Sequence, residues 1–255
     1  MSAADYTALD QQHLLARYLH QCEGVSSHFE CADRHWQAPF FGYGKPSSPV
    51  LEKGFLHFVP ARADSPLPED SIPVIQGLKM GALVRHIKHL NQQQHPALVY
   101  DLSPLASSPP YGDGLWKPKS REDLAELVAV ANCPLWLYGI ASPADAEVAV
   151  EAGVDAIVVA NDGLAALSPP ACLHLIPEIL DVVAGMARLF SAGPVRDGVD
   201  IFKYLALGAE AMVIRSDRHL YGLMLELHYA MKLTACETLG DISYEAIYTP
   251  LFDDR

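Results

Sequence analysis

Short apolar runs recur along the second half of the chain and are separated by segments with helical periodicity. The runs are rich in β-branched or aromatic residues, and each is followed by glycine, asparagine or arginine, which is typical of buried strands. Helix signals stand between them, because Ser142 is an N-cap residue followed by Pro143, and Gly153 ends that predicted helix. The alternation predicts a parallel sheet with strands at residues 135–138, 156–160, 188–192 and 211–214.

The first half of the chain continues the same alternation. Further strand patterns occupy residues 39–43, 56–59, 73–76 and 97–100. Helices are predicted over 80–93 and from Ser120, which opens a capping-box-like start, to residue 131. Together with the four later strands this makes eight, so the sequence predicts an α/β protein with a single closed (β/α)8 TIM barrel.

The N-terminal region differs from this alternation. Apolar residues spaced three and four apart predict a helix over 7–22, and residues 23–38 show no period and are predicted to form a loop. We therefore divide the chain into an N-terminal helix and loop, residues 1–38, and a barrel over 39–255. No linker or change in composition indicates a further domain.

Composition and charge restrict the class of partner. The chain has 255 residues and a formal net charge of -13, which argues against nucleic acid or an anionic membrane as a main partner. No apolar run approaches the roughly 20 residues of a membrane span. The five cysteines are scattered without a Cys-x-x-Cys pair, which favours reduced thiols and a cytoplasmic location.

Two groups of residues have the side chains of possible metal ligands. His86 and His89 lie three residues apart on the predicted helix 80–93, but the charged residues beside them indicate a solvated face. The histidines and cysteine within 28–35 lack a fourth ligand at a suitable spacing. We therefore predict no metal site.

The segments 146–161, 193–214 and 233–243, with the turn at Gly139, carry a family resemblance. From about residue 116 to the C-terminus the chain resembles the FMN-dependent α-hydroxy acid dehydrogenases, the glycolate oxidase and L-lactate dehydrogenase group. It is more distantly similar to type 2 isopentenyl diphosphate isomerase. The resemblance implies a barrel that binds FMN at its mouth and acts as an oxidoreductase, here with shortened loops in the first half.

The catalytic positions that the resemblance implies are substituted. Tyr138 stands where the family has a lysine beside the flavin N1–C2=O edge, and tyrosine brings no positive charge at neutral pH. Asp162 replaces the histidine base, and Ala165 replaces the arginine that binds the substrate carboxylate. An aspartate that orients such groups falls on Ala192. Tyr138 and Asp162 are either catalytic in new chemistry or polar residues that fill the mouth.

The cofactor positions are kept only in part. Pro194 replaces a glycine of the phosphate-binding turn and removes one N–H donor, while Arg215 and Ser216 replace a Gly-Arg pair. Gln76 matches a glutamine that contacts the flavin, or else it closes the end of its strand. The residues that the resemblance implies for FMN are Gln76, Asn161, Gly163, Gly193, Arg196, Arg215 and Ser216.

Two functions remain open at this point. One is a divergent FMN-binding oxidoreductase with a small-molecule ligand at the barrel mouth. The other is a non-catalytic pseudoenzyme barrel that acts as a scaffold or binding partner for a second copy or another protein. A mouth lined by Arg196 and Arg215 would favour the first, whereas a mouth plugged by Tyr138 and Trp136 would exclude flavin.

Overall fold

The fold is described from a computed structural model of the chain. It describes residues 14–15, 24–31, 33–44, 54–61, 67–68, 71–77, 79–103, 119–161, 171–215 and 218–248. Among these, no helix has both the length and the apolar character that crossing a membrane requires.

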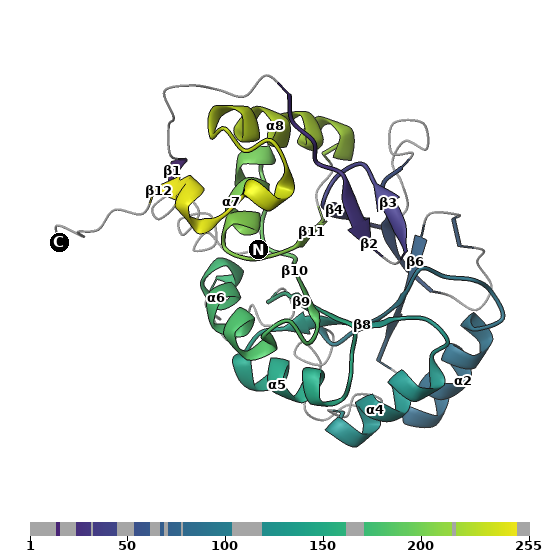
Figure 1. Ribbon diagram of the computed structural model, residues 1–255. Helices are drawn as coiled ribbons and strands as arrows, with labels where there is room; N and C mark the ends of the chain where they lie inside the picture. The colour runs from purple at the N-terminus through teal and green to yellow at the C-terminus, as the bar shows by residue number, and fades with distance from the viewer. Residues whose placement is uncertain are drawn as a thin grey trace.

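Eight parallel strands form a closed barrel in the order β10-β11-β4-β5-β6-β7-β8-β9 (Figure 1). This confirms the predicted (β/α)8 architecture. Two strands are longer than predicted. β6 begins two residues earlier, at Ser71, and β8 continues through a bulge at Gly139, whose φ of 100° favours glycine. The strands are β4 (Phe40–Tyr43), β5 (His57–Pro60), β6 (Ser71–Gln76), β7 (Leu98–Asp101), β8 (Leu135–Ile140), β9 (Ala156–Val159), β10 (Arg188–Ser191) and β11 (Ala211–Ile214).

Helices surround the barrel on its outer side (Figure 1). The predicted caps are confirmed, because Ser120 forms a capping box and the Ser142 side chain accepts a hydrogen bond from the Asp145 N–H. The α-helices are α2 (Met80–Leu90), α4 (Arg121–Val130), α5 (Pro143–Glu151), α6 (Cys172–Val183), α7 (Gly198–Ala206) and α8 (Leu220–Leu233). Two short 3-10 helices follow, η2 (Leu239–Asp241) and η3 (Tyr244–Ala246).

The predicted N-terminal helix over 7–22 is wrong at its centre. Leu14–Leu15 forms the short strand β1, which pairs antiparallel with β12, Ile247–Tyr248. Pairing with a segment more than 200 residues away, which no local pattern reveals, overrides the helical spacing. The rest of the predicted helix lies outside the described residues.

The predicted loop over 23–38 is also corrected, because it contains a β-hairpin. Strands β2 (Phe29–Cys31) and β3 (Arg34–Trp36) pair antiparallel, and Asp33 in the turn has a φ of 57°. In β2, buried and exposed residues alternate, a period that is difficult to recognise in three residues.

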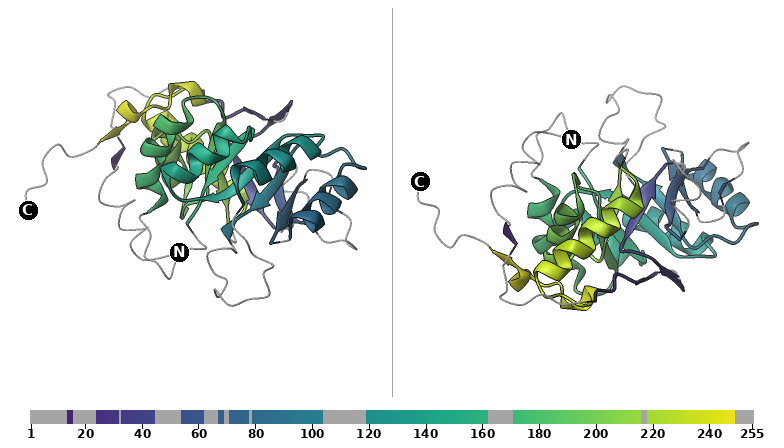
Figure 2. Two further views of the ribbon diagram at one scale, coloured as in Figure 1. Left: turned by 90° about the horizontal axis from the view of Figure 1, so that it is seen from below. Right: turned by 90° about the horizontal axis from the view of Figure 1, so that it is seen from above.

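The hairpin closes the amino-terminal end of the barrel (Figure 2). The ring of Phe29 lies 6.1 Å from that of Phe41 and 6.5 Å from that of Phe190. Arg188, the first residue of β10, stacks over Phe29 at 4.9 Å from the ring centroid. Trp136 packs against Phe41 and Phe190 in this interior layer, so it does not plug the mouth.

Candidate functional site

Polar side chains gather at the end of the barrel where the strands have their carboxyl termini, here called the mouth. Tyr43, Gln76 and Asp101 are the last residues of β4, β6 and β7. Tyr138 lies in β8, and Arg215 directly follows β11. In (β/α)8 barrels this end carries the active site, which makes these residues the candidate site.

Asp101 is the buried carboxylate of the mouth and is only 2% exposed. It accepts hydrogen bonds from the Gln76 Nε2 at 2.6 Å and from the Ser103 backbone N at 2.9 Å. The Tyr43 hydroxyl donates a longer bond of 3.5 Å to the same carboxylate. Three donors therefore satisfy Asp101, and it fixes the orientation of the Gln76 amide.

Arg215 brings a positive charge to the mouth. Its Nη1 donates to the Tyr138 hydroxyl at 3.1 Å, across 77 residues of sequence. Its Cζ lies 4.2 Å from the Tyr43 ring centroid and 5.8 Å from that of Tyr138, within the range of cation–π attraction. The two rings lie 5.9 Å apart, so Arg215 is held against both.

Both tyrosines at the mouth are neutral near pH 7. Burial raises the pKa of the Tyr138 phenol far above its usual value, and the smaller opposing effect of Arg215 does not reverse this. Burial, followed by the charge of Asp101, raises the pKa of Tyr43 to about 12. Tyr138 therefore acts as a neutral hydrogen-bonding group, and the positive charge belongs to Arg215.

The raised pKa of Tyr43 predicts a loss of stability in alkali. Because the folded chain holds this proton more tightly than the unfolded chain, the stabilisation is complete below pH 10 and is lost as pH rises towards about 12. We expect the melting temperature of the wild type to fall more steeply than that of Tyr43→Phe across this range. Thermal unfolding followed by circular dichroism checks this, and parallel pH profiles would contradict it.

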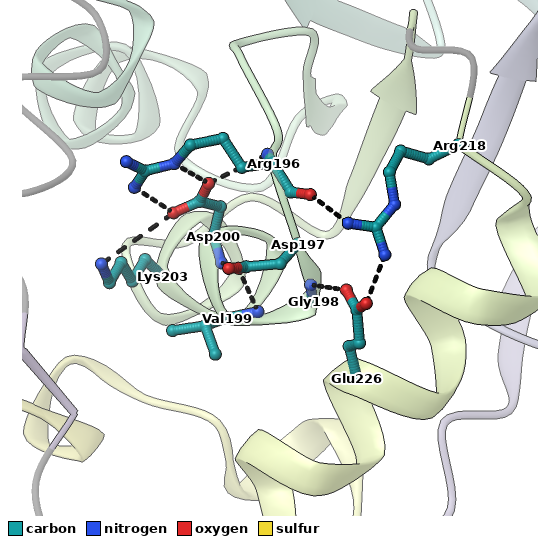
Figure 3. A network of polar contacts seen from close by, with 8 residues as sticks. All are labelled: Arg196, Asp197, Gly198, Val199, Asp200, Lys203, Arg218 and Glu226. Carbon is teal, nitrogen blue, oxygen red and sulfur yellow. Dashed lines mark hydrogen bonds and ion pairs between the residues drawn. The ribbon is translucent and has the colours of Figure 1, made fainter.

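The loop between β10 and α7 holds Arg196 in an ion pair with Asp200 (Figure 3). The Asp200 carboxylate accepts from Arg196 Nε at 2.8 Å, from Nη2 at 3.0 Å and from the backbone N at 3.0 Å. Asp200 is 1% exposed, and Lys203 Nζ lies 4.0 Å from its Oδ1. The charge of Arg196 is thus balanced by a carboxylate in the first turn of α7.

Carboxylates also occupy the amino end of α7 (Figure 3). Asp197 accepts from the backbone N–H groups of Val199 and Asp200 at 2.9 and 3.0 Å. Glu226, on α8, accepts from the Gly198 N at 3.0 Å and pairs with Arg218. The donors of this helix end, which attract anions, are therefore engaged by the chain's own side chains.

The structure brings together three of the predicted site residues, Gln76, Tyr138 and Arg215, at the mouth. Gly193 has a packing reason for being glycine, since an added Cβ would lie 1.9 Å from the Tyr204 hydroxyl. Asn161 lies two residues after the end of β9 and is half-buried. The predicted residues Asp162, Gly163 and Ser216 lie outside the described residues, so their roles stay predictions.

Tyr43 and Asp101 are the site residues that sequence reasoning missed. The predicted strand 97–100 ended one residue too early, which left Asp101 in the following loop. Tyr43 was placed at the end of the predicted strand 39–43 but was given no role at the site. The available signal was their position, because a polar residue at the carboxyl end of a barrel strand points to function.

The donors at the mouth fit the ring end of a flavin. Ser103 Oγ is buried and has no hydrogen-bond partner within the described part of the chain, and it lies beside the Asp101 contact. Gln76 and Arg215 add an amide and a guanidinium at the same end. The phosphate end fits less well, since Arg196 is already paired with Asp200.

The fold and mouth define a (β/α)8 barrel with its polar site at the strand carboxyl termini, and solved structures share this fold. A crystal structure of mandelate oxidase matches with a TM-score of 0.78 and 18% identity, covering 97% of this chain and 89% of that one. A mandelate oxidase mutant with a monooxide FMN adduct matches with a TM-score of 0.77 and 20% identity, covering 98% and 91%. At this identity the likeness concerns the fold.

The chain belongs to the FMN-dependent dehydrogenase family, whose model matches residues 77–249. The peroxisomal (S)-2-hydroxyacid oxidase GLO3 of Arabidopsis thaliana is 36% identical over 146 residues, 51% of this chain and 40% of that protein. An L-lactate oxidase of Roseobacter sp. (strain GAI101) is 33% identical over 140 residues, 49% and 38%. The matched region thus spans about 40% of these relatives, and the predicted family resemblance is confirmed.

Proposed function

We propose that this chain is an FMN-binding protein of the oxidoreductase class that does not oxidise α-hydroxy acids by its family's route. The observation that carries the proposal is the guanidinium of Arg215 on the Tyr138 hydroxyl at the mouth. This contact supports a positive charge beside Tyr138, the position at which the resemblance implies a lysine. Gln76, bound to Asp101, is a further polar group at the mouth. The resemblance implies that Asp162 and Ala165 replace the family's base and its carboxylate-binding arginine.

The chain's own residues have separate roles in this proposal. FMN, when bound, supplies the redox chemistry. Gln76, Ser103 and Arg215 would hold its ring, and Asp101 keeps the Gln76 amide in a fixed orientation. Arg196 contributes little net charge to the phosphate, because its partner Asp200 is a buried carboxylate.

Two substitutions argue against hydroxy-acid oxidation. Asp162 at the position of the histidine base is a weak base at neutral pH, and a positioned base contributes about 10²–10⁴-fold. Ala165 removes a bidentate contact to the substrate carboxylate, and a charge-assisted bond contributes about 1.5–3 kcal/mol. The site would therefore offer a hydroxy acid neither an effective proton acceptor nor an arginine to bind its carboxylate.

A visible spectrum and an FMN titration of the purified protein test the proposal. We expect flavin to bind, and we expect kcat/KM for glycolate, L-lactate and (S)-mandelate to lie at least about 10³-fold below that of the Arabidopsis thaliana oxidase measured in parallel. Turnover within tenfold of that enzyme would contradict the loss of the family reaction. A colourless protein that binds no FMN at high micromolar concentration would contradict the flavin site.

The second candidate function is a non-catalytic barrel that binds a second copy or another protein. The observation that favours it is the engagement of the α7 amino end by Asp197 and Glu226, together with the pairing of Arg196. Absence of FMN binding would select this function. The cytoplasmic location stays a prediction, since one relative above is named as peroxisomal, and imaging of a fluorescent fusion would test it.

A further inference from the structure

We propose that Arg215 supplies, from the end of β11, the positive charge that the family places on a lysine in β8. The charge would then come from the residue after β11 instead of from β8, which we call the charge transposition. The hydrogen bond from Arg215 to the Tyr138 hydroxyl holds the guanidinium beside the position that the family's lysine occupies. This inference rests on the proposed FMN binding, and it assigns Arg215 to the flavin ring rather than to the phosphate.

Three contacts define the position of the guanidinium. Nη1 donates to the Tyr138 hydroxyl at 3.1 Å, and Cζ stacks 4.2 Å from the Tyr43 ring centroid. The Tyr138 ring lies 5.8 Å from the same carbon. A guanidinium fixed on a ring face and by a hydrogen bond has little freedom, so its charge is preorganised at the mouth.

The charge balance of the pair matches that of a lysine. Arginine stays protonated throughout the physiological range, and the buried Tyr138 phenol is neutral because burial raises its pKa. The pair therefore carries one positive charge, like a single lysine. The Asp101 carboxylate is bound by Gln76, Ser103 and the Tyr43 hydroxyl and not directly by Arg215. Arg215 instead contacts the ring of Tyr43.

A bound flavin would report this charge through its redox equilibrium. A cation near the N1–C2=O edge stabilises reduced, anionic flavin more than the oxidised ring. Its removal should weaken the binding of reduced FMN relative to oxidised FMN by at least about tenfold, which is about 30 mV for a two-electron couple. This readout does not require turnover of any substrate.

The test compares four variants for FMN affinity and for the midpoint potential of bound FMN. Arg215→Gln removes the charge and should lower the potential, whereas Arg215→Lys keeps the charge and should lower it less. The double variant Tyr138→Lys with Arg215→Gln moves the charge to the family position and should restore the potential. Tyr138→Phe keeps the charge but removes the hydrogen bond that positions it, so its potential should lie between those of the wild type and Arg215→Gln. Thermal unfolding verifies that each variant is folded.

The outcomes separate the two proposals. If the wild type binds FMN but Arg215→Gln keeps the wild-type potential, the charge transposition is overturned and the proposed FMN binding stands. A folded double variant that retains the potential of Arg215→Gln also overturns the transposition. If the wild type binds no FMN, both proposals are overturned.

Discussion

Replacing Asp200 by alanine is expected to lower the free energy of unfolding by about 3–5 kcal/mol, the usual cost of breaking a buried ion pair from one side. Asp200 is 1% exposed and is bound by Arg196 through three hydrogen bonds. Lys203, itself only 7% exposed, lies 4.0 Å away. Without the carboxylate, this buried ammonium group loses a nearby negative charge, and the loop that holds Arg196 loses its anchor.

Urea unfolding followed by circular dichroism measures this change. Asp197→Ala is the matched control, because it removes a carboxylate from the same helix end, and loss of an N-cap costs only about 0.5–2 kcal/mol. Equal losses for the two variants would show that Asp200 contributes capping alone. A smaller loss in Asp200→Ala than in the control would contradict a structural role for the buried pair.

Substitution of Gly198 by alanine is expected to destabilise the protein by about 3 kcal/mol, at the upper end of the usual cost of overpacking. An added Cβ would lie 2.1 Å from the Leu227 backbone N and 2.4 Å from the Glu226 carbonyl carbon. These are backbone atoms of α8, so the clash cannot be relieved by a change of side-chain rotamer. Helices α7 and α8 must move apart, which also strains the hydrogen bond from the Gly198 N to Glu226.

Gly222→Ala, in the same pair of helices, is expected to raise the stability of the protein. Gly222 lies inside α8 with no atom within 4 Å of an added Cβ. Alanine there should stabilise the helix by roughly 0.5–1 kcal/mol, because it restricts the unfolded chain and favours helix. Chemical denaturation of both variants gives the comparison, and a neutral Gly198→Ala would refute the close packing of the two helices.

Local patterns predicted most of the barrel. The eight strands follow from short β-branched runs, and the caps at Ser120 and Ser142 follow from residue types that accept hydrogen bonds from the first helical turn. The hairpin over 29–36 did not follow, because its apolar residues are buried by the barrel end that it covers. Leu14–Leu15 likewise takes its strand conformation from a distant partner.

At the site, too, contacts between residues close in sequence were accessible to prediction, whereas contacts between distant residues were not. The pairing of Arg196 with Asp200 was available in the sequence, since residues four apart can interact at a helix start. The meeting of Arg215 with Tyr138 was not, because it joins residues 77 positions apart. Asp101 was missed because the end of its strand was placed one residue too early.

The sequence by itself determined the barrel, the helix caps, the family and the substituted catalytic positions, because each depends on neighbouring residues or a continuous motif. Only the tertiary structure decided where the charges lie. Closure of the barrel through the pairing of β11 with β4 places Arg215 beside Tyr43. The buried carboxylate of Asp200, in the first turn of α7, holds Arg196 in an ion pair. The cost of removing charge from water thus fixes one arginine in a buried ion pair, while aromatic rings hold the other at the mouth.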